Sequence, residues 1–277
     1  MLTTIYRRAL RSILIAVALL AVDTVSAADA KTTADVCWQR AIDAYTERRY
    51  ADAVADFEQV AALGYHSADL YYNLGNAYFK LGQERLNGIG RSFASGELGR
   101  AVLNYRRALR LDPSMTDARY NLELAVDYTN DTQAIPEPLV ASLWHSLRDT
   151  ATSNSWATLS LFGLALALVA LLVYLLAERA LYRKIAFALC VVLVLLFVLF
   201  LSLSLSQRAA MKERTRAVVI CNDTTPVHAS PDSASKVIRQ PSQGVTLTTL
   251  RSHEGWSEIL FADGEKGWIR TSQIELI

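Results

Sequence analysis

The chain has 277 residues, of which 52% are apolar and 20% are charged, with a formal net charge of +1. This near-neutral balance argues against nucleic-acid binding through bulk electrostatics, because it implies no strongly basic surface. Much of the apolar content lies in two long uncharged stretches in the second half of the chain, so the sequence predicts a membrane protein with soluble segments on either side of them.

Residues 1–27 have the pattern of a secretory signal. Three arginines precede the apolar run Ile13–Val22, and the small residues Ser26 and Ala27 follow it. This order is typical of signal peptides that are cleaved after a small residue. An uncleaved anchor of the same orientation stays open as the alternative. In both cases the segment that follows is predicted to be exported.

Residues 28–130 are predicted to form paired helices. Leu74 and Gly75 precede Tyr78 by four and three residues, and the segment Ala101–Pro113 carries alanine, tyrosine, alanine and proline at matching places. These segments resemble the first and second helices of a tetratricopeptide repeat. In the same register, residues 34–64 form an earlier repeat and residues 116–128 a closing helix. The extra residues over 83–95 are interpreted as a lengthened turn between the two helices.

The first helices of these repeats share a face on which similar residues recur. Spacings of three and four place aspartates, aromatic residues and asparagines on this face. The family resemblance implies that such a face lines a concave groove that holds a protein partner. Alternatively, the aromatic residues pack between repeats and the aspartates favour the positive helix N-termini. The predicted partner-binding residues are Asp35, Trp38, Asp69, Tyr72, Asn73, Asn76 and Tyr120.

Residues 131–155 are predicted to be a linker that contains an amphipathic helix. The segment Pro136–Pro138 ends the array, and an apolar stripe with helical spacing follows it, which includes Leu143 and Trp144. The stripe either caps the array or lies in the membrane interface. Its position directly before the first long apolar stretch favours the interface.

Residues 156–177 and 185–206 are predicted to be two transmembrane helices joined by a cytoplasmic turn over 178–184. At about 1.5 Å of rise per residue, each stretch can cross a hydrocarbon core of roughly 30 Å. Neither contains an aspartate, glutamate, lysine, arginine or histidine, which argues against a transporter and favours an anchor. Gly163 and Ala167 form a small-residue pair that suits close helix packing.

The basic residues of the turn agree with the positive-inside rule, whereas those after the second span do not. The signal segment and the first span carry more weight, because early segments usually set the orientation. Both soluble modules are therefore predicted to lie on the periplasmic side of the bacterial inner membrane.

After a linker over 207–214, residues 215–277 are predicted to form an all-β domain. Apolar and polar residues alternate in short runs, and the turn Asp263–Gly264 separates two of them, as in antiparallel hairpins. Two Gly-Trp pairs give this segment a resemblance to the bacterial SH3-type domain. The resemblance suggests a ligand groove lined by Trp256 and Trp268, although the second tryptophan is commonly structural in the family.

No catalytic or metal site is predicted. The cysteines are Cys37, Cys190 and Cys221, whose spacing fits neither a zinc site nor a redox motif, and the four histidines are scattered. No nucleophile, base and orienting group cluster in either soluble block. The prediction is a non-enzymatic protein without a cofactor.

The order of these segments resembles the BatE proteins of bacterial aerotolerance operons over nearly the whole chain, including the run Gly96–Ala125. The predicted fold is therefore a multi-domain membrane protein: an all-α tetratricopeptide array, two transmembrane helices and an SH3-like barrel. The resemblance implies an envelope scaffold that acts with membrane-anchored von Willebrand factor A-type Bat proteins and a MoxR-type ATPase. The alternative is a peptidoglycan-binding sensor or tether that acts through the barrel.

Overall fold

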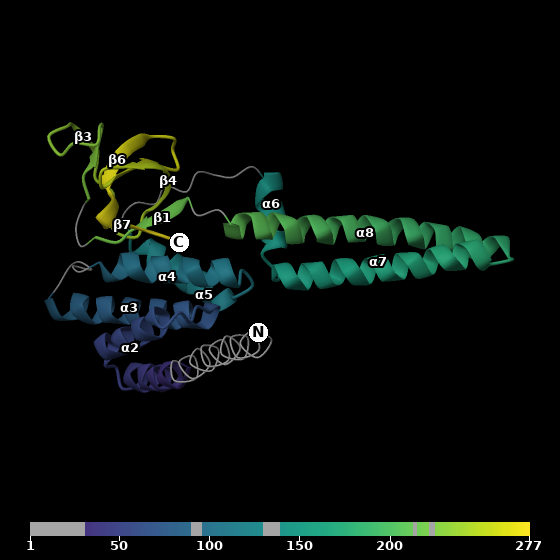
Figure 1. The fold of residues 1–277 in the computed structure, drawn as a ribbon, viewed down its shortest axis with the longest axis horizontal. Helices are drawn as coiled ribbons and strands as arrows, with labels where there is room; N and C mark the ends of the chain where they lie inside the picture. Colours follow the sequence, from purple (N-terminus) through teal and green to yellow (C-terminus); the bar gives the residue numbers. More distant parts are fainter. Residues whose placement is uncertain (1–30, 90–95, 130–138, 213–214, 222–224) are drawn as a thin grey trace, which may run out of the picture.

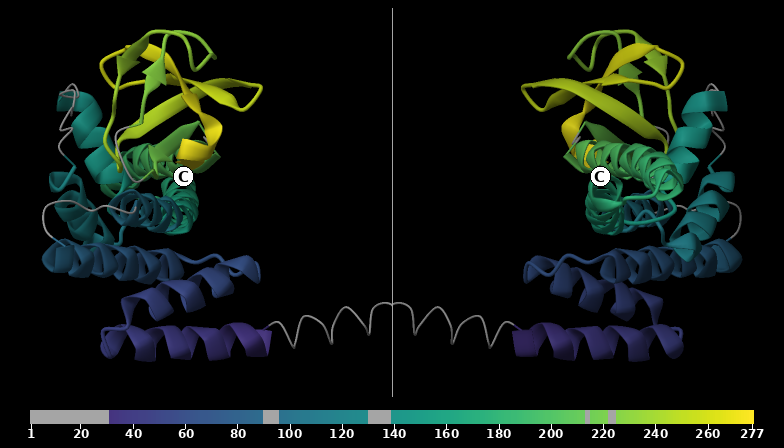
Figure 2. Two further views of the ribbon diagram at one scale, coloured as in Figure 1. Left: turned by 90° about the vertical axis from the view of Figure 1, so that its left-hand side faces the viewer. Right: turned by 90° about the vertical axis from the view of Figure 1, so that its right-hand side faces the viewer.

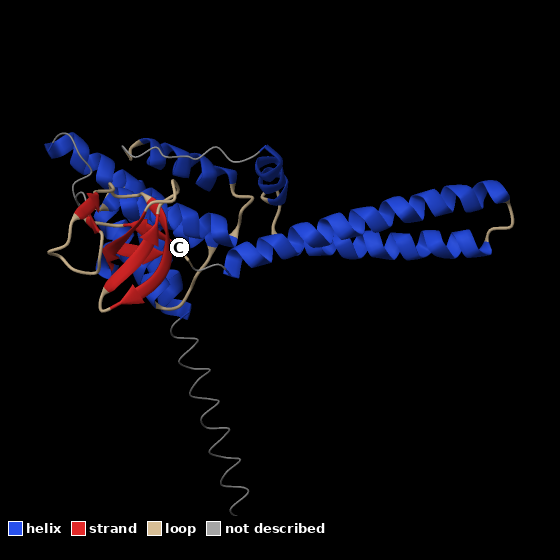
Figure 3. Cartoon of the chain, turned by 90° about the horizontal axis from the view of Figure 1, so that it is seen from above, coloured by secondary structure: helices blue, strands red, loops and turns tan. Residues whose placement is uncertain are grey.

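The computed structural model describes residues 31–89, 96–129, 139–212, 215–221 and 225–277. The predicted signal segment lies outside these residues. Figure 1 shows three parts: a stack of helices, a small sheet packed on it, and a long helical hairpin. Seen from above, the hairpin extends away from the other two parts (Figure 3).

Within the described residues, five successive helices form the first part. Helices that follow one another in the chain pack against each other, as α2 does with α3, α3 with α4, and α4 with α5. Figure 2 shows them as layers beneath the sheet. Gly64, with a φ of 87°, follows α2 in the left-handed conformation that commonly ends a helix. The helices span residues 31–46, Tyr50–Ala62 (α2), Ala68–Ile89 (α3), Glu97–Leu111 (α4) and Thr116–Asp127 (α5).

The helical core is built largely on α3 and α4. Leu70, Leu103 and Tyr105 are almost fully buried, and burial of each such side chain stabilises the fold by about 1.5–3 kcal/mol. A Cβ atom on Gly75 would lie 2.7 Å from the ring of Tyr105. The Leu-Gly pair of the repeat pattern therefore lets α4 approach α3 closely.

The lengthened turn expected over residues 83–95 is partly helical. Helix α3 continues to Ile89, so only residues 90–95 of that segment lie outside the described chain. Gln83, Glu84 and Arg85 are all good helix formers, which explains the extension. Arg85 also forms an ion pair with Glu97 at the start of α4.

Helices α7 (Ser153–Leu176) and α8 (Ala180–Lys212) form the hairpin. Within the described residues, these two helices are long and apolar enough to cross a membrane, and most of their apolar surface is exposed. The residues of α7 that are buried in this contact recur at spacings of three and four, as in helix pairs that pack with a left-handed supercoil. The connection is shorter than the expected turn over 178–184, because α8 already begins at Ala180. The buried residues of α7 are Ser153, Trp156, Ser160, Gly163, Ala167 and Ala170.

Helix α6 (Leu139–Arg148) runs across the base of the hairpin (Figure 1). Trp144 Nε1 donates a hydrogen bond to Ser206 Oγ on α8 over 3.4 Å. The apolar stripe to which Trp144 belongs is otherwise exposed, and in it Val140 is 80% and Leu143 is 61% exposed. This stripe does not cap the helical array; it faces outward beside the hairpin.

The C-terminal part is one seven-stranded antiparallel sheet with the order β3-β2-β6-β5-β4-β1-β7. Its own small core contains Leu247, Ile259 and Ile269. Gly264 has a φ of 89° in the turn between β5 and β6, as the Asp-Gly pair predicts. The strands are β1 (Arg216–Val219), β2 (Val227–His228), β3 (Val237–Arg239), β4 (Thr246–His253), β5 (Trp256–Leu260), β6 (Lys266–Arg270) and β7 (Ile274–Leu276).

The sheet is docked on α4. Val218 of β1 belongs to the helical core, and Gly99 N donates to Gln243 Oε1 over 3.3 Å. A Cβ atom on Gly99 would lie only 2.4 Å from the carbonyl oxygen of Val219, so the contact requires glycine. Arg107 donates to Glu275 Oε1 over 2.8 Å and thereby holds β7. The helices and the sheet therefore share one packed interface.

Candidate functional site

The predicted groove residues fall into two groups. Trp38 is partly buried and packs edge-on against Phe57, with 5.4 Å between the ring centroids. Tyr72 is also partly buried and lies 6.4 Å from the ring of Tyr105. These two aromatic residues therefore contribute to packing between helices, as the alternative interpretation of the sequence anticipated.

Asn76 lies at the centre of a hydrogen-bond network. Its Oδ1 accepts one hydrogen bond from the hydroxyl of Tyr105 and another from Asn121 Nδ2, each over 2.8 Å. Burial raises the pKa of Tyr105, so the hydroxyl stays protonated and can donate. Asn76 therefore connects α3 with α4 and α5.

The remaining predicted groove residues are more open. Tyr120 on α5 is 67% exposed, and the carboxylates of Asp35 and Asp69 are exposed near the starts of their helices. Asn73 is partly buried. Tyr120 and the two aspartates are thus the exposed members of the first-helix face, while its inner members contribute to the fold.

The two tryptophans of the sheet lie on the side opposite its core. In the β5–β6 pair, Trp256 stands opposite Arg270, and Glu258 stands opposite Trp268. Alternation along a strand puts these four side chains on one face, whereas Ile259 points to the core. We call these four residues together with Arg251 and His228 the tryptophan face. Sequence reasoning identified its two indoles but not the charged residues around them.

Charged side chains cover the indoles of the tryptophan face. The guanidinium carbon of Arg270 lies 4.2 Å from the ring centroid of Trp256, and that of Arg251 lies 5.4 Å from Trp268. Arg251 Nε also donates to Glu258 over 2.6 Å. The tryptophans themselves are only 5% and 9% exposed. A ligand therefore meets cationic groups backed by aromatic rings, which suits carboxylate groups.

His228 closes one end of this face. Its ring lies edge-on to Trp256, with 5.2 Å between centroids, and its Nδ1 donates to the carbonyl oxygen of Ser235 over 3.0 Å. His228 is buried despite its polar ring. The histidine thereby ties the loop before β3 to the tryptophan face.

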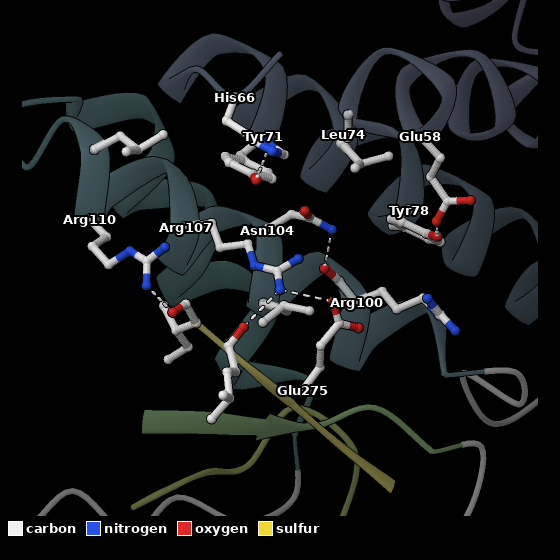
Figure 4. A pocket seen from close by; sticks show the side chains of 15 residues that line it. Glu58, His66, Tyr71, Leu74, Tyr78, Arg100, Asn104, Arg107, Arg110 and Glu275 are labelled. Atoms are coloured by element: carbon white, nitrogen blue, oxygen red, sulfur yellow. Dashed lines mark hydrogen bonds and ion pairs between the residues drawn. The ribbon is translucent and has the colours of Figure 1, made fainter. Parts of the chain in front are cut away.

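A cavity of about 630 Å³ lies between the helices and β7. Figure 4 shows Arg100 and Arg107 on one of its walls, opposite Tyr71 and Tyr78. Each arginine lies over one of these rings. The guanidinium carbon of Arg100 lies 5.8 Å from the ring centroid of Tyr78, and that of Arg107 lies 5.7 Å from the ring centroid of Tyr71. Sequence reasoning missed this cavity, because β7 forms part of it and nothing local in the sequence brings β7 to α4.

Polar side chains in the same cavity already form hydrogen bonds with neighbouring residues. Tyr78 donates to Glu58, and burial followed by this hydrogen bond raises the pKa of Tyr78. Asn104 Nδ2 donates to the carbonyl oxygen of Arg100 over 2.8 Å, whereas its Oδ1 is buried with no hydrogen-bond partner in the described part of the chain. The cavity has room for a small polar molecule, although Asn104 Oδ1 itself is buried beneath its surface.

No group of three or more histidine, cysteine, aspartate or glutamate residues within the described ranges could hold a metal ion. Cys37, Cys190 and Cys221 are free thiols. Burial raises the pKa of the Cys221 thiol, whose Sγ donates to the carbonyl oxygen of Gln273. These thiols therefore supply packing rather than a disulfide.

Comparison with known families identifies the sheet. Residues 223–275, from just before β2 into β7, match the bacterial SH3 domain. The C-terminal part of the chain is thus a bacterial SH3 domain. The match includes all the residues of the tryptophan face, and it does not extend to the helices. No curated protein matches the chain.

Proposed function

We propose that this protein is a membrane-anchored envelope protein whose bacterial SH3 domain binds peptidoglycan, without catalysing a reaction. The tryptophan face carries the proposal, because it lies within the segment that matches the family. Stem peptides of peptidoglycan carry carboxylates, which suit Arg251 and Arg270. The indoles beneath these arginines hold the guanidinium planes in place.

Sedimentation of the purified full-length protein with isolated cell-wall material tests this function. Arg270→Gln should weaken binding by about tenfold, since it removes a charge-assisted hydrogen bond to a carboxylate. Arg239→Gln is the matched control, because Arg239 lies over Phe261 of the domain core and pairs with Asp263 rather than belonging to the tryptophan face. A wild-type protein that stays in the supernatant would contradict wall binding.

The hairpin supports membrane anchoring, and we propose that it spans the inner membrane with both soluble modules on the periplasmic side. The packing of β1 on α4 favours a common side, since a bilayer cannot separate two parts that share a core. Tags at Lys31 and Ile277 should both be exposed to protease in spheroplasts. Protection of only one tag would contradict the proposed topology.

We propose a second function for the helical region, as a tetratricopeptide-type scaffold in a Bat-type envelope complex. The observation in its favour is the open part of the first-helix face, where Tyr120 is 67% exposed. Rigid aromatic side chains at such places suit partner binding. The proposed partners are von Willebrand factor A-type Bat membrane proteins.

A photo-crosslinking residue in place of Tyr120 tests the scaffold in cells. It should capture a Bat protein, whereas the same residue in place of Arg49, on the loop before α2, should not. Equal capture from both positions, or capture from neither, would count against the scaffold.

A further inference from the structure

A second cavity, of about 460 Å³, lies where the helices, the hairpin and the sheet meet. Side chains of α4, α5, α6, α8 and β1 line it. They include Arg106, Arg110, Arg148 and Arg216, but Asp149 is the single acidic side chain among the described residues that line it. The cavity is therefore strongly cationic.

Two of these arginines have other partners. Arg148 Nε donates to Asp149 over 2.6 Å, so each neutralises the other. Arg110 donates to the backbone oxygen of Ile277. Arg106 and Arg216 thus carry the excess charge of the cavity.

Arg106 is the unusual residue of this cavity. Its Nε is buried and has no hydrogen-bond partner within the described chain. Burial, together with the nearby charge of Arg216, lowers the pKa of Arg106 to about 10. The side chain is still charged at neutral pH, and a largely desolvated charge without a counter-ion among the described residues is costly. An anion in the cavity would remove that cost.

The cavity lies beside the predicted membrane surface. Its lining residues Gln207, Ala210 and Met211 belong to the end of α8, beyond the apolar stretch. Helix α6 contributes His145 and Arg148 to the cavity, while its apolar stripe faces outward on another side. An amphipathic helix of this kind lies at headgroup depth.

Tryptophan contacts agree with this depth. Trp156 Nε1 donates to the carbonyl oxygen of Arg148 over 2.9 Å, which fixes the end of α6 to the start of α7. Tryptophan is enriched where a membrane span meets the headgroups. A phosphate at the membrane surface would therefore lie level with the cavity.

We propose that this cavity binds the phosphate of an anionic phospholipid headgroup, with Arg106 and Arg216 as its charged ligands. Arginine matches phosphate geometry through its planar set of donors. Leu109, Leu122 and Met211 provide apolar surface for the glycerol end of the lipid. The inference rests on the membrane insertion of the hairpin, which is part of the proposed function.

Lipid titration of the full-length protein in a neutral detergent tests the site, with native mass spectrometry as the readout. Phosphatidylglycerol should bind at least about tenfold more tightly than phosphatidylcholine, and Arg106→Gln should abolish this preference. Arg208→Gln is the matched control, because Arg208 lies on the same end of α8 and bonds to Ser153 rather than lining the cavity. The control should stay within about twofold of wild type.

A second measurement separates a binding role from a structural one. Without lipid, Arg106→Met should unfold at the same temperature as wild type or higher, because it replaces a buried unpaired charge with an apolar side chain. Phosphatidylglycerol should then raise the unfolding temperature of wild type only.

Three outcomes would overturn the inference. Equal losses in Arg106→Gln and Arg208→Gln would indicate general surface attraction, and full protection by inorganic phosphate alone would indicate a free-anion site. An unchanged lipid preference in Arg106→Gln would exclude Arg106 as a ligand of the lipid phosphate. Flotation with neutral vesicles tests membrane insertion separately, so a protein that floats but lacks lipid preference contradicts only this inference.

Discussion

Three helical glycines differ sharply in what surrounds them. A Cβ atom would meet the ring of Tyr105 at Gly75 and the backbone of Val219 at Gly99, but at Gly163 the nearest atom would be 3.7 Å away. The first two glycines allow another element to approach, whereas the third leaves ordinary van der Waals space. The same residue type therefore has different tolerance to substitution in the helices and in the hairpin.

Gly99→Ala should destabilise the protein by about 1–3 kcal/mol, because the added methyl group forces the sheet away from α4. Gly163→Ala should not destabilise it, since the methyl group fits and alanine favours the helix by about 1 kcal/mol. Thermal unfolding in detergent measures both. Equal unfolding temperatures for the two variants would refute the close contact at Gly99.

Asn76→Ala should lower the free energy of unfolding by about 1–3 kcal/mol, since it leaves the buried hydroxyl of Tyr105 without its acceptor. Asn73→Ala, in the same helix, should cost clearly less. Denaturant unfolding of the two variants checks the difference. If Asn73→Ala lost as much stability as Asn76→Ala, the effect would come from helix α3 itself rather than from the hydrogen-bond network.

At the scale of elements, α6 and the hairpin differ in which apolar side chains they expose. The hairpin buries small residues between its helices and exposes large ones all around, which suits lipid. Helix α6 exposes only one apolar stripe and turns His145 and Arg148 toward a cavity. One element suits the hydrocarbon core and the other suits the surface of the membrane.

A spin label at Leu143→Cys should therefore be more accessible to oxygen than to a water-soluble relaxation agent in vesicles. A label at Ser142→Cys should show the reverse, because this exposed residue lies outside the apolar stripe. Both variants need a background without the three free thiols. Aqueous accessibility at residue 143 would rule out the interfacial position of α6.

Periodic patterns predicted most of the elements. The paired helices, the two apolar helices and the antiparallel sheet follow from spacings within each segment, and the bacterial SH3 match agrees with the two Gly-Trp pairs. The helical extension to Ile89 was missed, because a repeat template assigns a turn there while local helix propensity favours continuation. Propensity prevailed over the template.

At the scale of the whole molecule, the decisive feature is the docking of the sheet on α4. Val218 joins the helical core, and Arg107 holds β7 through Glu275. The sequence offered no sign of this contact, because it joins residues more than a hundred positions apart. Both cavities depend on it, so neither was predicted, whereas the tryptophans of the SH3 domain were.

Because of this shared interface, the helices and the sheet should unfold together. Helical circular dichroism and tryptophan fluorescence should give coincident thermal transitions, and Arg107→Gln should lower both by a few degrees. Arg49→Gln, which removes two exposed ion pairs remote from the interface, with Glu47 and Asp52, is the control and should change neither. Two separate transitions in wild type would show that the sheet folds independently.

Strand β1 begins four positions after α8 ends, so its first Cα can lie at most about 14 Å from the last Cα of the helix. The same strand supplies Val218 to the helical core and Val219 to the core of the sheet. The short connection therefore limits how far the shared strand can lie from the end of the hairpin, so the soluble modules stay close to the membrane end of α8 whatever the tilt of the hairpin.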